Sequence, residues 1–383
     1  MKKIYQAIVI LLLTVWIPAF LSSCSKDDSD GDGNPVINYV RVTKPESADS
    51  LLVGAGQGQL VAIVGDNLQN VRQVFFNDKE SVLTPTYVTN KTVLVAVPSQ
   101  VPEDITNKMR LIFANGFVLE HDFRTEINKP QISGMACEYV PAGGTAIIRG
   151  NYFYKPVKVA FNGGAEAQVL SVKDDRLEVL VPEGAQPGQI TITTNFGTNK
   201  SDFWFRDNRN IFISSDPYTG WWNESFVVKR PGAGDPPAIN GNYIRVKQFI
   251  GSWSWIEVAG GPPDAMGTIS KNIPDEAILK PRDFNLKFEV NTVKPYSSNA
   301  IKINAGLAKD FNNDAYIWQP PIDTKGEWQT IVIPFEEVAA SYKTALTLSP
   351  AGYYARILFH GGGDLDADIA FDNFRIVPKT IKK

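Results

Sequence analysis

Glycine and proline punctuate this chain throughout, and that punctuation restricts what it can fold into. The 383 residues include 30 glycines and 25 prolines. Between them lie short apolar runs rich in Val, Ile, Phe and Thr, many of which alternate apolar and polar residues, as "DFNLKFEVNT" (283–292) does. After the first twenty residues we find no long run with the 3.6-residue period of a helix. The sequence therefore predicts an all-β protein.

Two stretches of the chain are similar to each other. "GQLVAIVGDNLQNVRQVFFND" (58–78) aligns with "GGTAIIRGNYFYKPVKVAFNG" (143–163), so that Gly65 matches Gly150 and Asn77 matches Asn162. Each copy has an alternating strand, a glycine that we expect to form a tight turn, and a "V-x-F-N" strand whose apolar residues, including Val74, point inward. The repeat predicts two consecutive domains of one kind.

The repeated pattern resembles the IPT/TIG domain, a small immunoglobulin-like sandwich. The resemblance implies one such domain at 35–127 and a second at 128–206. Neither repeat contains the cluster of tryptophans found later in the chain, so we expect both to act as spacers. A binding role of their own is the alternative.

Residues 207–383 break the repeat and carry most of the tryptophans. Their alternating segments fit a jelly-roll-like β-sandwich. Two of these segments, "GEWQTIVIPF" and "IAFDNFRIV", are similar to segments of carbohydrate-binding modules. Six of the eight tryptophans lie in this part: Trp221, Trp222, Trp253, Trp255, Trp318 and Trp328.

The N-terminus has the form of a processing signal. Lys2 and Lys3 precede an apolar run from 7 to 20, which is short for a membrane span, and "LSSC" follows. This end resembles a bacterial lipobox, which implies a signal peptide at 1–23 and a lipidated Cys24; a simple secretory signal is the alternative. Acyl chains would anchor the protein without a transmembrane helix.

The segment that follows, 24–34, is acidic and has little to bury, so we expect a flexible tether. It resembles the export signal of Bacteroidetes lipoproteins, which implies the outer membrane with the protein facing the exterior. A solvated linker without an address is the alternative. The net charge of −3 offers no electrostatic footprint for nucleic acid. With Cys24 lipidated, Cys137 remains, and we expect it to be a small buried residue.

Aromatic residues in polar surroundings are the candidates for ligand contact. In "GSWSWIEV", Trp253 and Trp255 are two residues apart, so on a strand they share one face. We expect that face to point outward, because Ile250, Ile256 and Val258 share the other; a core position is the alternative. In "DPYTGWWNE", Trp221 and Trp222 cannot both enter one core on a regular strand. We expect Trp222 to be the exposed ring of the two, because polar Asn223 and Glu224 follow it.

Three further aromatic residues have less certain environments in the sequence. Trp318, which precedes two prolines at a strand end, is placed at the rim of the site, although a core position is equally compatible with the sequence. Tyr218 is a candidate for ligand contact or for packing. Trp328 begins a strongly periodic strand, and we expect it to be structural.

An exposed indole can cover the apolar face of a pyranose while amide and acidic side chains pair with its hydroxyls. The mature chain as a whole resembles the Bacteroidetes surface glycan-binding proteins, lipoproteins of the SusE/SusF position, with a xyloglucan-binding-type C-terminal domain. This resemblance implies capture of a β-glucan, xyloglucan or β-mannan for a SusC-like TonB-dependent transporter and a SusD-like lipoprotein. It matches the family's platform to Trp222 and to Trp253 with Trp255.

Two other classes of function compete with glycan binding. A glycoside hydrolase needs a pair of carboxylates across the scissile bond, and the spacing of Asp216, Glu224, Glu257 and Asp314 forms no recognised pair. A protein-binding adhesin would display apolar anchors mixed with Arg and Met, and this chain has only 4 methionines. The sequence therefore favours a non-catalytic binding protein.

Alternate aspartates near the C-terminus raise the question of a bound metal. Asp364, Asp366, Asp368 and Asp372 could hold a structural Ca²⁺, but they lack a complete ligand loop. A solvated turn followed by an edge strand is the favoured interpretation. We therefore expect no cofactor, with structural Ca²⁺ as the open alternative.

Overall fold

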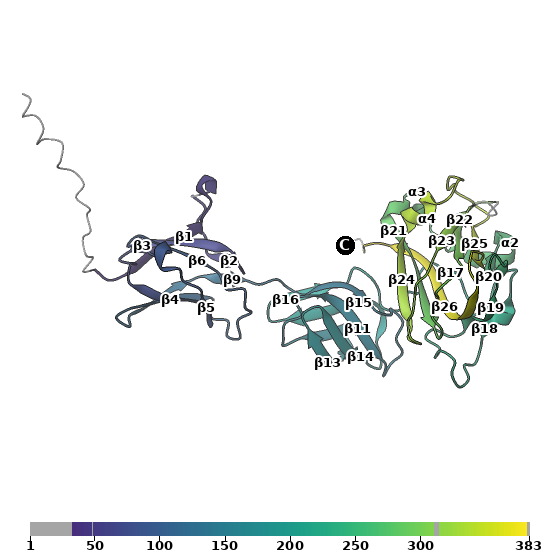
Figure 1. Ribbon diagram of the computed structural model, residues 1–383, viewed down its shortest axis with the longest axis horizontal. Coiled ribbons are helices and arrows are strands. Elements are labelled where there is room, and N and C mark those ends of the chain that lie inside the picture. The colour runs from purple at the N-terminus through teal and green to yellow at the C-terminus, as the bar shows by residue number, and fades with distance from the viewer. Residues whose placement is uncertain (1–32, 48, 310–313, 381–383) are drawn as a thin grey trace, which may run out of the picture. The chain divides into compact units, whose positions relative to one another are not determined.

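The computed structural model describes residues 33–47, 49–309 and 314–380 (Figure 1). The expected signal peptide, Cys24 and most of the acidic tether lie outside these residues. None of the helices within the described ranges is long and apolar enough to cross a bilayer. The chain divides into two compact units, one ending at Ile127 and the other beginning at Asn128.

The first unit is a sandwich of two antiparallel sheets, in the order β1-β3-β6 and β5-β4-β7-β8, with a parallel pair β2-β9. Val74 and Phe76 are buried between the sheets, as the alternation predicted. Short 3₁₀ turns lie at Pro45–Ser47 and Pro85–Tyr87. The strands are β1 (Val36–Val42), β2 (Gly54–Gly56), β3 (Leu60–Asp66), β4 (Val71–Phe76), β5 (Lys79–Ser81), β6 (Thr92–Ala96), β7 (Lys108–Phe113), β8 (Val118–Asp122) and β9 (Arg124–Glu126).

The second sandwich repeats this plan, with sheets ordered β10-β11-β14-β13 and β12-β15-β16. Its strands are β10 (Gln131–Met135), β11 (Thr145–Asn151), β12 (Lys158–Asn162), β13 (Gln168–Lys173), β14 (Arg176–Leu180), β15 (Gln186–Thr194) and β16 (Gly197–Lys200).

The matching glycines of the two repeats have the same role, but not the expected one. Gly65 lies within β3, and a Cβ there would come within 1.9 Å of the carbonyl oxygen of Val36. At Gly150 a Cβ would come equally close, 1.9 Å, to the carbonyl oxygen of Gln131. Both glycines therefore allow a close backbone approach at an irregular strand pair, rather than a tight turn.

The terminal domain is a larger sandwich with short helices at its ends. One sheet has the order β18-β19-β26-β21-β24, with β17 also paired to β26, and the other has the order β20-β25-β22-β23. The strands are β17 (Ile211–Ile213), β18 (Val227–Val228), β19 (Tyr243–Ile250), β20 (Ile256–Gly261), β21 (Phe284–Thr292), β22 (Ile301–Leu307), β23 (Tyr316–Trp318), β24 (Gln329–Pro334), β25 (Tyr354–Phe359) and β26 (Leu365–Pro378). The helices are α2 (Pro263–Met266), α3 (Asp275–Leu279) and α4 (Phe335–Ala340), with 3₁₀ turns at Glu224–Phe226, Gly267–Lys271 and Pro281–Asp283.

The apolar core of this domain lies between the inner faces of its two sheets. Along β21, Leu286, Phe288 and Val290 face this core, so Lys287 and Glu289 project from the opposite, outer face. The all-β class, with two immunoglobulin-like sandwiches before a jelly-roll-like one, is confirmed. We expected the C-terminal aspartate segment to form an edge strand, and this expectation is wrong. It lies on β26, which pairs with β19 on one side and with β21 on the other.

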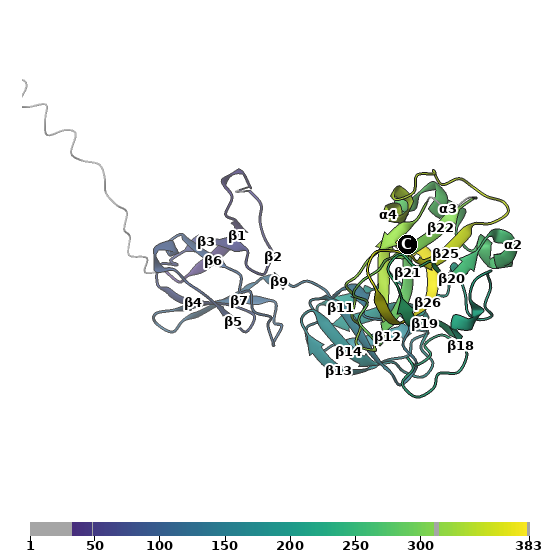
Figure 2. The ribbon, with the colours of Figure 1, turned by 45° about the vertical axis from the view of Figure 1, so that its right-hand side comes forward.

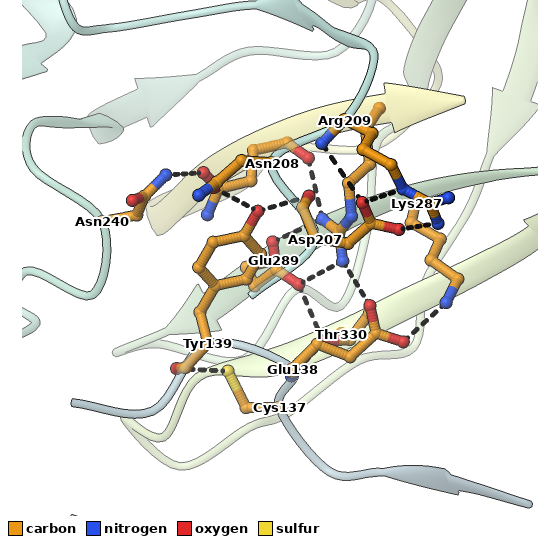
Figure 3. Close-up of polar contacts among 12 residues, drawn as sticks. Cys137, Glu138, Tyr139, Asp207, Asn208, Arg209, Asn240, Lys287, Glu289 and Thr330 are labelled. Carbon is orange, nitrogen blue, oxygen red and sulfur yellow. Dashed lines mark hydrogen bonds and ion pairs between the residues drawn. The ribbon is translucent and has the colours of Figure 1, made fainter. Parts of the chain in front are cut away.

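The second sandwich and the terminal domain form one compact unit, joined by buried charges on the outer face of the six-stranded sheet (Figure 3). Arg375 donates to Glu289 at 2.8 Å and to Glu138, from the second sandwich, at 2.6 Å. Lys287 donates to the other oxygen of Glu138, also at 2.6 Å. Because Arg375 and Glu289 have no exposed surface, these ion pairs lie in a low-dielectric environment.

Two buried residues beside this junction were predicted as such from the sequence. Trp328 is 7% exposed; its ring packs edge-on against Tyr243, and its indole nitrogen donates to the carbonyl of Pro237 at 2.8 Å. Cys137 is buried, and burial raises the pKa of its thiol. Both contribute to the core that the second sandwich shares with the terminal domain.

We expect Glu138→Ala to lower the free energy of unfolding by about 3 to 5 kcal/mol, because it leaves buried Arg375 and Lys287 without one carboxylate. Glu178→Ala is the control, since its partially exposed pair with Arg176 should contribute about 1 kcal/mol or less. Chemical denaturation measures both. If both variants lowered the free energy of unfolding by the same small amount, the buried ion pairs of Glu138 would not stabilise the junction as proposed.

Trp328→Ala should cost about 3 to 5 kcal/mol by creating a cavity in the shared core. Phe249→Ala removes an aromatic ring that is 66% exposed, and the change should stay within about 0.5 kcal/mol. Thermal and urea unfolding of the pair would test the structural role of Trp328, which a loss similar to that of Phe249→Ala would refute.

Candidate functional site

The exposed tryptophans of the terminal domain gather along β20, one of the two edge strands of the four-stranded sheet. Trp253 is 65% exposed and Trp255 is 50% exposed, in the connection between β19 and β20. Both point outward as expected, but from a turn rather than a regular strand, since Trp253 has φ +60°. Buried Ile250 and Val258 flank this turn and hold its ends in the core.

A second aromatic segment, residues 220–222, runs beside the other end of β20. The backbone N–H of Trp221 donates to the carbonyl of Gly260 at 2.9 Å. The two chains approach so closely that a Cβ at Gly220 would lie 2.3 Å from the carbonyl oxygen of Gly260. Glycine at position 220 is therefore what allows this segment to lie against the strand.

The order of exposure within this segment differs from the prediction. Trp221 is 61% exposed, whereas Trp222 is half-buried and meets the Trp221 ring edge-on at 6.4 Å. The expectation that Trp222 is the exposed ring is therefore wrong. The segment is not a regular strand, so alternation could not determine which ring turns outward.

Asn223 and Glu224 continue this segment toward the sheet. Asn223 adopts a left-handed conformation with φ 46°, and its amide donates to the carbonyl oxygen of Glu257 in β20. Glu224 is exposed and pairs with Lys229 at 3.2 Å. Asn223 thus fixes the aromatic segment to β20, while Glu224 lies at the open surface.

Two other predicted site residues lie elsewhere. Trp318 is 8% exposed and packs against Phe288 and Tyr296 in the core, so its expected place at the rim of the site is wrong. It lies on β23, where its neighbour Ile317 takes the outward position. Tyr218 is half-buried against the same core, and burial raises the pKa of its hydroxyl to about 12.

His360 connects the two exposed rings of the β19–β20 turn. Its ring centroid lies 5.6 Å from that of Trp253 and 4.9 Å from that of Trp255. It comes directly after β25, the strand adjacent to β20. We use the name aromatic platform for Trp221, Trp222, Trp253, Trp255 and His360.

A row of polar side chains lies on the outer face of the four-stranded sheet, beside Trp255. Trp255 donates its indole N–H to Glu257 at 2.7 Å, and the guanidinium of Arg356 lies 5.5 Å from the Trp255 ring centroid. Arg356 approaches the same Glu257 oxygen at 3.7 Å and donates to Asn304 at 2.9 Å. The row crosses β20, β25 and β22, and it fixes the position of the Trp255 ring.

Burial shifts the ionisation of this row. It raises the pKa of Glu257, against the opposing effects of the Trp255 hydrogen bond and the Arg356 charge. It lowers the pKa of Lys302, which lies on the same face of β22 and is further affected by Arg356. The charged groups beside the platform are therefore partly removed from water. In this less polar environment their hydrogen bonds are stronger than in water.

The polar row was missed from the sequence, although a signal existed. In "YARILFH", Ala355, Ile357 and Phe359 face the core, so Arg356 and His360 must face outward. Which tryptophan they would meet depended on strand pairing. That pairing cannot be obtained from one sequence.

This arrangement offers exposed indole faces, which suit a ligand with an apolar face, whereas Arg356 and Asn304 of the polar row are buried and support Trp255 from within the domain. No cluster of three or more His, Cys, Asp or Glu side chains suited to a metal occurs in the part of the chain that the structure describes.

Comparison with known proteins identifies similar domains and folds for this chain. Residues 205–378 match the family model described as the surface glycan-binding protein B xyloglucan binding domain. The chain is also 25% identical over 207 residues to an IPT/TIG domain-containing protein of Bacteroides ovatus. That alignment covers 52% of this chain and 39% of the relative, so the chain spans well under two thirds of that relative's length.

Among solved structures, the surface glycan-binding protein PbSGBP-B of Prevotella bryantii matches with a TM-score of 0.71 and 20% identity. The match covers 91% of this chain and 99% of the other, and it shows a shared fold. The resemblance to surface glycan-binding proteins that the sequence indicated is confirmed.

Proposed function

We propose that this chain, whose terminal domain matches the xyloglucan-binding domain family, is a non-catalytic polysaccharide-binding lipoprotein of the outer cell surface. The observation that carries the proposal is the exposed aromatic platform along β20, with Trp221, Trp253 and Trp255 each at least half exposed. Large exposed rings grouped along one strand edge mark an interaction site.

The ligand class follows from the chemistry of the platform. Indole faces cover the C–H faces of pyranose rings, and the two aromatic segments lie beside Ile256 and Gly260 of one strand. Four residues of extended strand span about 13 Å, so the platform extends over several sugars of a chain. A β-glucan, xyloglucan or β-mannan presents such repeated faces.

The cellular role rests on the sequence resemblance. A lipidated Cys24 and the acidic tether would attach the protein to the outer membrane, facing outward. The captured polysaccharide would pass to a SusC-like TonB-dependent transporter with its SusD-like lipoprotein. The two immunoglobulin-like sandwiches would space the terminal domain from the membrane.

Affinity electrophoresis of the chain from residue 34 onward tests this function, in gels that contain xyloglucan, mixed-linkage β-glucan, galactomannan, laminarin, xylan or pullulan. We expect retardation by one or two β-linked glycans without the release of new reducing ends. Trp221→Ala, Trp253→Ala and Trp255→Ala should each weaken binding roughly 30-fold, because each removes about 2 kcal/mol of apolar contact.

Tyr87→Ala is the matched control for these variants, since Tyr87 is 50% exposed in the first sandwich, and it should bind as the wild type does. Retardation in none of the gels, or normal binding by all three tryptophan variants, would contradict the proposal. New reducing ends would instead identify an enzyme.

The polar row supplies a second prediction, because Glu257 accepts the indole N–H of Trp255. Glu257→Ala should lower glycan affinity about tenfold by releasing this ring, whereas Glu257→Gln retains an acceptor and should bind nearly normally. Isothermal titration with an oligosaccharide of the retarding glycan measures both. If Gln and Ala lowered the affinity equally, the carboxylate charge would matter rather than the position of the ring.

A further inference from the structure

A polar pocket of about 400 Å³ lies on the terminal domain, where β17 ends beside the loop that precedes β19. This pocket belongs to the six-stranded sheet, whereas the aromatic platform belongs to the other sheet. Its polar lining residues are Asn208, Ser214, Ser215, Asp216, Asn240, Asp372 and Asn373.

Asp372 brings a buried carboxylate to this pocket. An irregularity in the pairing of β21 with β26, where Asn373 has φ 52°, places Asp372 and Asn373 side by side in the lining. Asp372 is 7% exposed; its Oδ1 accepts the N–H of Asn373 at 2.8 Å. Its Oδ2 is buried and has no hydrogen-bond partner among the residues that the structure describes. A buried acidic oxygen without a partner is costly.

The amide of Asn373 completes this picture. Its oxygen accepts a hydrogen bond from Asn240, and its nitrogen is buried without a partner in the described part of the chain. Amide oxygen and nitrogen are assigned from hydrogen bonding and can be exchanged. Exchanging them in both asparagines keeps their mutual hydrogen bond and turns the unpartnered atom of Asn373 into an oxygen.

The surrounding charge is unbalanced toward acid. The buried residues at this end of the junction include three carboxylates, of Glu138, Glu289 and Asp372, but two cations, of Lys287 and Arg375. Burial, together with the charges of Glu289 and Asp216, raises the pKa of Asp372 well above its usual range.

Asp216 stands at the more exposed side of the pocket. Both of its carboxylate oxygens accept the backbone N–H of Asn242, at 2.9 and 3.1 Å, which fixes the side chain in place. The pocket therefore combines two carboxylates with amide and hydroxyl oxygens, and its opening lies toward solvent.

We propose that this pocket binds a divalent cation, Ca²⁺, with Asp372 and Asp216 as its charged ligands. The side-chain atoms of the pocket that can ligate a metal ion are all oxygens, and oxygen ligands favour a hard cation over Zn²⁺. Ca²⁺ accepts irregular sets of carboxylate, amide and water oxygens, whereas Mg²⁺ demands a regular octahedron. The ion would neutralise the excess buried acid and fix the junction of β17, β26 and the loop before β19. This inference does not depend on the proposed glycan binding.

The other aspartates of the same segment are already occupied. Asp364 accepts the N–H of Ser252, Asp366 pairs with Lys294, and Asp368 is bound by Arg245 at 2.7 Å. The sequence pattern that suggested Ca²⁺ therefore does not form one site, and only its last member lines the pocket.

Thermal unfolding of the chain from residue 34 onward, after removal of metals with EDTA, tests this site. Addition of 10 mM CaCl₂, on the order of ten times the upper dissociation constant of extracellular Ca²⁺ modules, should raise the midpoint by about 2 to 4 °C relative to EDTA at equal ionic strength. Asp372→Asn should abolish the rise, and Asp216→Asn should reduce it. Asp366→Asn, which changes an exposed aspartate of the same strand, should leave it intact.

A proton on Asp372 is the competing way to balance the charge, and the same variants distinguish it. A raised folded-state pKa means that the fold binds this proton more tightly than the unfolded chain, so stability falls as pH rises through the folded-state pKa. Without a cation site, the wild type would show no response to Ca²⁺, and Asp372→Asn would be at least as stable as wild type at pH 7 in EDTA. That result, or a Ca²⁺ response retained in Asp372→Asn, would overturn the proposal.

Discussion

The architecture of residues 128–378 depends on one buried guanidinium. Arg375 is fully buried and joins Glu289 of its own sheet to Glu138 of the preceding sandwich. A charge in that position is stable only while both carboxylates remain in place, so separating the two domains would leave it unpaired. The interaction therefore joins the two sandwiches into one unit. The second sandwich then covers part of the outer face of the six-stranded sheet.

That assignment of faces decides where a ligand can be recognised. With that face covered, the aromatic platform lies at the β20 edge of the other sheet, whose outer face is itself partly covered, since Arg356 and Asn304 there are buried. The aromatic segments attach to its edge strand, and the row from Glu257 to Asn304 lies on it. In Figure 1 the second sandwich lies beside β24, and in both Figure 1 and Figure 2 the strands β20 and β25 lie away from it. The junction and the platform thus do not compete for the same residues.

Much of the fold was predictable because the sheets are regular. Alternation identified the strands and placed Val74, Phe76 and Phe161 in their cores. The repeat gave the two similar sandwiches, and the periodic strand after Trp328 indicated a structural ring. The buried junction was not predicted, because Glu138, Lys287 and Arg375 look like ordinary polar positions of half-exposed strands until the pairing of domains is known.

The site was predictable in part. The two tryptophans of "WSW" were expected on the surface and lie there, but the order of Trp221 and Trp222 was reversed. Trp318 was misplaced because a strand end before two prolines does not reveal which face its last residue takes. Arg356 lies on β25 and His360 directly after it, far in sequence from the tryptophans, so which residues they contact depends on the register of the strand pairing. Local pattern determines which face a residue takes, whereas the composition of a site is determined by nonlocal pairing.

The segment that carries Trp221 also covers the edge of a sheet. Its backbone pairs with Gly260 at the exposed side of β20, a position where an uncovered strand could recruit another chain. The exposed side chain at 221 can therefore change with the ligand, whereas the length of the segment and Gly220 cannot. A substitution at position 221 can therefore change which ligand is bound. A deletion in the segment would instead uncover the edge of β20, which could then pair with another chain.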